Sequence, residues 1–183
     1  MCHLRLAIAA LLLATGCAAA ARTMTEDIRL ADVSVRPVSA TSGSPTGQYS
    51  YSDEAVSFNW VLNPNTLSFT LQNTTPDTIK IIWADSAYVD EGGFGHRIWT
   101  GGGLFIDKDK PAAPTVVPPG TAVTRFIMPV ENIVQVPTPQ GYQWQQRPLV
   151  TPNSLGRTVR AVIALQIGND VRDYSFAFEV MPR

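Results

Sequence analysis

The sequence predicts an all-β protein, an antiparallel sandwich of about eight or nine strands. Apolar and polar residues alternate along several short stretches, and this period of two is typical of half-buried strands. Turn-forming residues recur between these stretches, with 13 Gly and 14 Pro among 183 residues. On a helix, the same apolar residues would be scattered around the axis and would form no buried face.

The clearest alternation begins at residues 55–62, AVSFNWVL, and continues at residues 66–72, TLSFTLQ. A third strand is predicted at residues 79–83, IKIIW. Residues 63–65 (NPN) and 73–77 (NTTPD) separate the three strands and are rich in turn formers. This spacing of strand and turn is that of a sandwich or a barrel.

The middle of the chain is less regular. Residues 87–90 and 94–99 flank Glu91-Gly92-Gly93, which predicts a tight hairpin. The Gly101–Gly103 run is interpreted as a connection, because a phosphate loop would need a following helix, whereas strand is expected at Leu104–Ile106. The other assignments are loop at 39–48 and 107–119, strand at 121–128 and 132–136, and an irregular aromatic segment at 137–152.

Two strands of marked alternation complete the chain. Residues 158–167 place Val, Ala, Ile and Leu at every second position, and residues 174–180 do the same with Tyr, Phe, Phe and Val. Gly168-Asn169-Asp170 turns the chain between them. Burying each such side chain contributes about 1.5–3 kcal/mol, so these faces would pack on those of residues 56–71. We therefore expect an immunoglobulin-like antiparallel β-sandwich.

The N-terminus has the features of a secretory signal. Arg5 precedes the apolar run Leu6–Leu13, and small residues follow. The run is too short to span a bilayer, which needs about 20 apolar residues. Its end, Leu13-Ala14-Thr15-Gly16-Cys17, resembles the bacterial lipobox, in which the Cys receives lipid. Ordinary cleavage within residues 18–21 is one alternative, and a retained apolar leader is the other.

Lipidation at Cys17 would divide the chain into three parts. These are a lipoprotein signal peptide at 1–16, a lipidated N-terminus and tether at 17–31, and the β-sandwich at 32–183. A helical turn is conceivable at 24–30. Ala18 follows the Cys, whereas an Asp there favours inner-membrane retention in enterobacterial lipoproteins. The resemblance therefore implies a bacterial cell-envelope protein anchored at the periplasmic face of the outer membrane.

Composition excludes several function classes. The formal net charge is -1, and nucleic-acid binding needs a concentrated basic face. Residues 18–183 contain no Cys, so the folded domain has no disulfide, thiol nucleophile or Cys-ligated metal. His96 is the one His outside the leader, which excludes a multi-His metal site. We expect no cofactor, and the sequence indicates no oligomeric state.

A longer segment resembles a family. Residues 67–99 follow a pattern like F-x-L-x-N-x-(T/S)-x-x-x-I-x-I-x-W and then Y/F-V-D-x-x-G-x-x-H-R, which is similar to a group of uncharacterised bacterial lipoproteins. The resemblance covers about residues 49–135 and implies an immunoglobulin-like fold and an envelope location, with no activity attached. The matching residues are Phe69, Leu71, Asn73, Trp83, Tyr88, Val89, Asp90, His96 and Arg97.

These observations favour a non-catalytic binding or structural module with an envelope protein or a glycan as partner. Loops at one end of the sandwich are expected to carry the binding surface, because loops carry most binding residues. Trp83 and Trp99 are expected in the core. The candidate surface residues are Tyr88, Asp90, His96, Arg97, Tyr142 and Trp144.

Two alternatives stay open. The chain could be an envelope hydrolase of glycans or esters, with His96 or the group Asp85, Asp90 and Glu91 as its acid–base element. That hypothesis requires these side chains to converge on a cleft. The chain could instead be an inhibitor or a chaperone-like protein that binds its partner along an open sheet edge.

Overall fold

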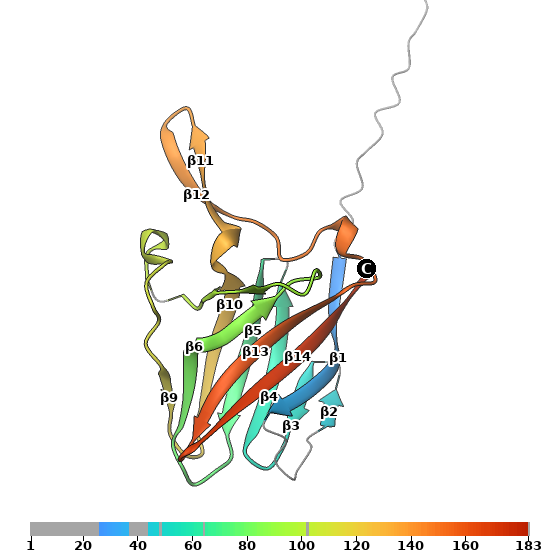
Figure 1. Cartoon of the computed structure of the whole chain (residues 1–183), viewed down its shortest axis with the longest axis vertical. Helices are drawn as coiled ribbons and strands as arrows, with labels where there is room; N and C mark the ends of the chain where they lie inside the picture. The colour runs from blue at the N-terminus through green and yellow to red at the C-terminus, as the bar shows by residue number, and fades with distance from the viewer. Residues whose placement is uncertain (1–25, 37–43, 48, 64, 102, 183) are drawn as a thin grey trace, which may run out of the picture.

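The computed structural model describes residues 26–36, 44–47, 49–63, 65–101 and 103–182. In this part of the chain, fourteen strands form two six-stranded antiparallel sheets and a separate two-stranded ribbon (Figure 1). Three short 3-10 turns complete the structure, and no described residue is in an α-helix. The predicted all-β class is confirmed.

The first sheet has the order β1-β14-β13-β6-β7, with β9 also paired to β6. Its C-terminal hairpin is the regular pair that the alternation predicts, with Thr158 opposite Glu179 and Ile167 opposite Asp170. The bounds are β1 Glu26–Arg36, β6 Ile79–Val89, β7 Gly95–His96, β9 Thr115–Val117, β13 Thr158–Ile167 and β14 Asp170–Pro182.

The second sheet has the order β2-β3-β4-β5-β10-β8, and the ribbon pairs β11 with β12. The bounds are β2 Ser44–Gly47, β3 Ser50–Ser52, β4 Val56–Asn63, β5 Thr66–Asn73, β8 Ile98–Trp99, β10 Ala122–Pro129, β11 Ile133–Thr138 and β12 Gly141–Gln146. The 3-10 turns are η1 Phe105–Asp107, η2 Val130–Asn132 and η3 Pro152–Ser154.

The core lies between the two sheets and is rich in aromatic rings. Phe58 of β4 lies 4.6 Å from Phe176 of β14, measured between ring centroids, and Trp60 lies 5.2 Å from Phe178. All four side chains are at most 2% exposed. Rings at 4.5–7 Å in tilted or edge-on geometry add to the stabilisation from burial itself. The predicted packing of residues 174–180 on residues 56–71 is therefore confirmed.

The expected tether and helical turn are wrong from residue 26 onward, because β1 begins at Glu26 and pairs with β14. The register shifts between Leu30 and Asp32, which marks a bulge. Positions 28, 30, 33 and 35 thereby stand opposite Val180, Phe178, Phe176 and Tyr174, all fully buried. The bulge interrupts the period of two and so conceals the strand in the sequence.

Three further segments differ from expectation. Strand β2 lies in the segment 39–48 that was expected to be a loop, and β12 lies in the segment 137–152 that was expected to be irregular. The sequence of β2 has no apolar alternation, and the alternation of Tyr142 and Trp144 in β12 buries no face, so both strands are defined by backbone pairing with a neighbour. The expected strand at Leu104–Ile106 gives way to η1, and the single strand expected at 94–99 is two strands, one in each sheet.

One end of the sandwich carries most of the irregular structure (upper part of Figure 1). We call it the ribbon end, defined by the β6–β7 hairpin tip, the turns η1, η2 and η3, and the β11–β12 ribbon. The opposite end carries the β13–β14 turn and β9 (Figure 1).

Candidate functional site

The hairpin between β6 and β7 is built around Asp90. Its backbone N–H donates to the carbonyl of Phe94 at 3.0 Å, and its carbonyl accepts from the N–H of Gly93 at 3.0 Å. The side-chain Oδ1 accepts from the N–H groups of Gly92 and Phe94, each at 2.9 Å. Gly93 has φ of 84°, a conformation that favours glycine. The predicted hairpin is confirmed, and Asp90 holds its loop.

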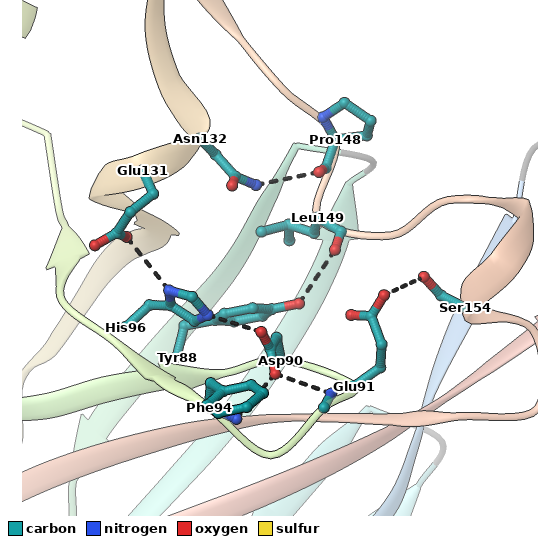
Figure 2. A network of polar contacts seen from close by, with 11 residues as sticks. Tyr88, Asp90, Glu91, Phe94, His96, Glu131, Asn132, Pro148, Leu149 and Ser154 are labelled. Carbon is teal, nitrogen blue, oxygen red and sulfur yellow. Dashed lines mark hydrogen bonds and ion pairs between the residues drawn. The ribbon is translucent and has the colours of Figure 1, made fainter.

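His96 lies between two carboxylates (Figure 2). Its Nε2 is 2.9 Å from Oδ2 of Asp90, and its Nδ1 is 3.5 Å from Oε2 of Glu131. Desolvation raises the pKa of Asp90, but hydrogen bonds from His96 and from the N–H groups of Phe94 and Gly92 outweigh it. The pKa of Asp90 is consequently held below its ordinary value.

Tyr88 was expected on the surface, but it is only 2% exposed. Its hydroxyl donates to the carbonyl of Leu149 at 3.3 Å, beneath the segment that leads away from the ribbon (Figure 2). Burial raises the pKa of this phenol, and the negative charges of Glu91 and Asp90 raise it further. Tyr88 therefore packs beneath the hairpin as a buried structural residue, and its side chain is unavailable to a ligand.

The acid–base group of the hydrolase hypothesis does not assemble. Glu91 accepts from the hydroxyl of buried Ser154 at 2.9 Å, while Asp85 is exposed on β6. Asp90 and Glu91 border a hollow of about 460 Å³, but neither Asp85 nor His96 lines it. Both nitrogens of His96 face carboxylates, so within the described residues no hydroxyl nucleophile is bonded to it.

The other candidate surface residues have partners other than Asp90 and Glu131 or lie on the ribbon. Arg97 is exposed and forms a salt bridge with Asp109 at 2.7 Å, which ties the loop after β8 to the hairpin. Tyr142 and Trp144 lie on the ribbon. Tyr142 is 77% exposed, whereas Trp144 is half-buried and contacts Phe105 of η1 with 6.1 Å between ring centroids. The sequence therefore identified residues of the ribbon end, but from two separate sites.

A groove that sequence analysis missed lies between strands β6, β8 and β10 and the segments 100–101 and 103–114. Its volume is about 570 Å³, and it continues into a smaller cavity of about 200 Å³ that shares Trp83 and Lys108. Trp83, Trp99 and Phe126 supply its aromatic lining. Trp83 donates from Nε1 to the hydroxyl of Thr115 at 3.0 Å. We call this the groove.

The charged lining of the groove is mainly basic. Lys108, Lys110 and Arg125 border it, with Asp107 as the one carboxylate in the lining. Lys110 pairs with Asp107 at 2.7 Å, whereas Lys108 is 3.6 Å from Asp109 and Arg125 donates to the carbonyl of Thr124. The lining therefore has more positive than negative charge.

Sequence reasoning could not find the groove, because its walls come from strands far apart in the chain. The available signal is the charged run Asp107-Lys108-Asp109-Lys110, which lies in the loop expected at 107–119. Trp99 was expected in the core but is half-buried at the groove, whereas Trp83 is 5% exposed and belongs to the core as expected.

Among the described residues, no three His, Cys, Asp or Glu side chains are grouped to hold a metal ion. No helix in this part of the chain has the length and apolar character needed to cross a membrane.

The predicted lipidation site, Cys17, lies outside the described residues. No family model matches the chain, and searches of curated proteins and of solved structures found no match.

Proposed function

We propose that this protein is a lipid-anchored, non-catalytic binding module of the bacterial cell envelope, and that the groove binds an organic anion with a flat or apolar face, such as an acidic sugar. The anchor would be Cys17, at the periplasmic face of the outer membrane, and the sandwich would be of the immunoglobulin-like type. The aromatic, cation-rich groove is the observation that carries the binding role.

The size and the lining of the groove support this class of ligand. Ligand sites are concave, with volumes of about 300–1,000 Å³ and an apolar lining that holds a few convergent polar groups. The groove, at about 570 Å³, falls in that range. Trp99 and Phe126 offer aromatic surface, while Lys108 and Arg125 would attract negative charge. A neutral sugar would use the rings alone, so it should bind more weakly than its acidic counterpart.

The binding role is tested by titrating the purified protein with oligogalacturonate and with its neutral methyl ester. Binding is measured by tryptophan fluorescence and by titration calorimetry. We expect Trp99→Ala and Lys108→Gln each to weaken oligogalacturonate binding by about tenfold, about 1.4 kcal/mol. Lys80→Gln is the matched control, because Lys80 is exposed on β6 and does not line the groove. Equal binding by all four proteins, or preference for the neutral ester, would contradict the proposal.

The anchor is tested separately in cells labelled with radioactive palmitate. The wild type should carry label and fractionate with membranes. Cys17→Ser should lose the label, because the proposed acceptor thiol is gone, and Cys2→Ser is the control with the other Cys replaced. Label that persists in Cys17→Ser would remove the anchor from the proposal and leave the groove unaffected.

A further inference from the structure

The most exposed large apolar side chains of the described chain gather at the ribbon end. Phe94, Leu104, Ile106 and Tyr142 are 71–77% exposed and lie on the hairpin tip, beside and within η1, and on the ribbon. The other large apolar residues with high exposure are three valines at 47–59%, which lie on β4, β9 and β14. Single exposed valines are ordinary, but a group of larger apolar residues on one end marks an interaction surface.

Side-chain contacts join these loops into one surface. Phe105 of η1 contacts Trp144 of the ribbon, and His96 of the hairpin lies 3.5 Å from Glu131 of η2. Asn132 donates to the carbonyl of Pro148, which fixes the segment leaving the ribbon (Figure 2). The apolar side chains therefore project from a connected set of loops.

The chain enters the sandwich at this same end. Glu26, the first residue of β1, is paired with Pro182 beside the C-terminus, in the upper part of Figure 1. From Cys17 to Glu26 the chain advances 26 - 17 = 9 residues. At ~3.3–3.6 Å per residue, a lipid on Cys17 would keep Glu26 within about 30 Å of the membrane surface.

This limit favours one orientation. The six-residue strands of the ribbon span five steps, about 17 Å at ~3.3 Å per residue, so a ribbon tip at the surface leaves Glu26 well within the limit of about 30 Å. In the inverted orientation, the nine steps along β13 would raise Glu26 by about 30 Å, which would require a fully extended tether. The length of the tether therefore favours the orientation with the ribbon end toward the lipid.

We propose that the ribbon end is a membrane-contacting surface of the anchored protein. Tyr142 and Trp144 would lie at the headgroup level, where amphipathic aromatic rings are favoured. Leu104, Ile106 and Phe94 lie on loops set back from the projecting ribbon and would face the membrane surface. The apolar area that this contact buries would strengthen the attachment by the lipid anchor. This inference rests on the proposed anchor at Cys17, and its occupant is a lipid surface.

The absence of Cys from residues 18–183 gives a direct test. Tyr142→Cys and Leu104→Cys introduce single thiols at exposed positions, and Val171→Cys near the β13–β14 turn is the control at the opposite end (Figure 1). Each full-length, lipidated variant is labelled with a polarity-sensitive fluorophore. It is then placed in vesicles of phosphatidylethanolamine and phosphatidylglycerol that contain nitroxide lipid.

We expect blue-shifted emission and at least about twofold stronger nitroxide quenching at positions 142 and 104 than at 171. Equal quenching at the three positions would overturn the orientation. If emission and quenching at position 142 change only after envelope proteins are added, the surface would bind a protein partner. That result would also overturn the proposed membrane contact. Mass spectrometry of the N-terminal peptide reports the lipid independently, so loss of the anchor is distinguishable from failure of the orientation alone.

Discussion

The β6–β7 hairpin and the groove both place charged side chains beside aromatic rings, but the charged groups are engaged in the hairpin and less engaged in the groove. In the hairpin, both carboxylate oxygens of Asp90 are bonded and Glu91 is held by Ser154. In the groove, Lys108 has one carboxylate at 3.6 Å, and Arg125 bonds to a neighbouring carbonyl. Polar groups that satisfy one another stabilise a loop, whereas those that border open space are available to a ligand.

The largest expected effect tests the structural role of the hairpin. Asp90→Ala should lower the free energy of unfolding by about 2–3 kcal/mol, because it removes acceptors for two backbone N–H groups and for His96. Urea denaturation measures the loss. Binding in the groove should be unchanged, because Asp90 does not line it.

Asp85→Ala is the matched control for this variant. Asp85 is an exposed aspartate at the same end of β6, and its removal should change stability by less than about 0.5 kcal/mol. If Asp90→Ala were as stable as this control but abolished oligogalacturonate binding, the hairpin would be the ligand site and the comparison would be reversed.

The next largest effect concerns Gly101, a glycine of the groove lining. Gly101 has φ of 79°, and a Cβ there would lie 2.7 Å from ring atoms of Phe126. Gly101→Ala should therefore cost about 1–2 kcal/mol in stability and displace Phe126 into the groove. Ligand affinity should fall by about tenfold. Gly103→Ala is the control, since a Cβ there meets nothing within 4 Å.

Much of the fold could be predicted, and the reason is burial on one face. Strands β4, β5, β13 and β14 alternate because the core takes every second side chain. Strand β9 is too short to show a period, although its Val117 is in the core. The alternation in β12 reflects no burial, since this strand pairs with β11 in the separate ribbon. A single bulge was enough to hide β1.

The candidate sites also differ in how far the sequence predicts them. Asp90 and His96 are six residues apart on one hairpin, so their proximity follows from the local turn signal. Nothing local indicates that Tyr88 is covered by Leu149, because that contact depends on a distant loop. The groove is harder still, since Trp83, Trp99 and Phe126 meet only through the pairing of strands in both sheets.

A smaller effect is expected within the groove wall. Thr115→Val removes the acceptor for Trp83 Nε1 while nearly keeping the side-chain volume. Leaving this largely buried donor unpaired should cost about 1 kcal/mol, measured by urea denaturation. Thr124→Val also alters the groove lining, but the hydrogen bond between Thr124 and Thr70 is exposed, so water can replace it. The variant should therefore lose less than about 0.5 kcal/mol of stability. Equal losses would show that Trp83 finds another acceptor.

The smallest effect is the response of the hairpin to acid. The hydrogen bonds of Asp90 hold its folded-state pKa below its ordinary value, near 3.9 in an unfolded chain. Its contribution to stability is therefore complete above about pH 4–5 and is lost as the pH falls through the lower, folded-state pKa. Protonation leaves a carbonyl oxygen that still accepts, so the loss should be smaller than in Asp90→Ala. Urea midpoints measured from pH 6 to pH 2.5 should fall more for the wild type than for Asp90→Ala, which has no such group to protonate. Parallel curves for the two proteins would mean that Asp90 is no better stabilised in the hairpin than in water, and the contrast between the hairpin and the groove would lose its physical basis.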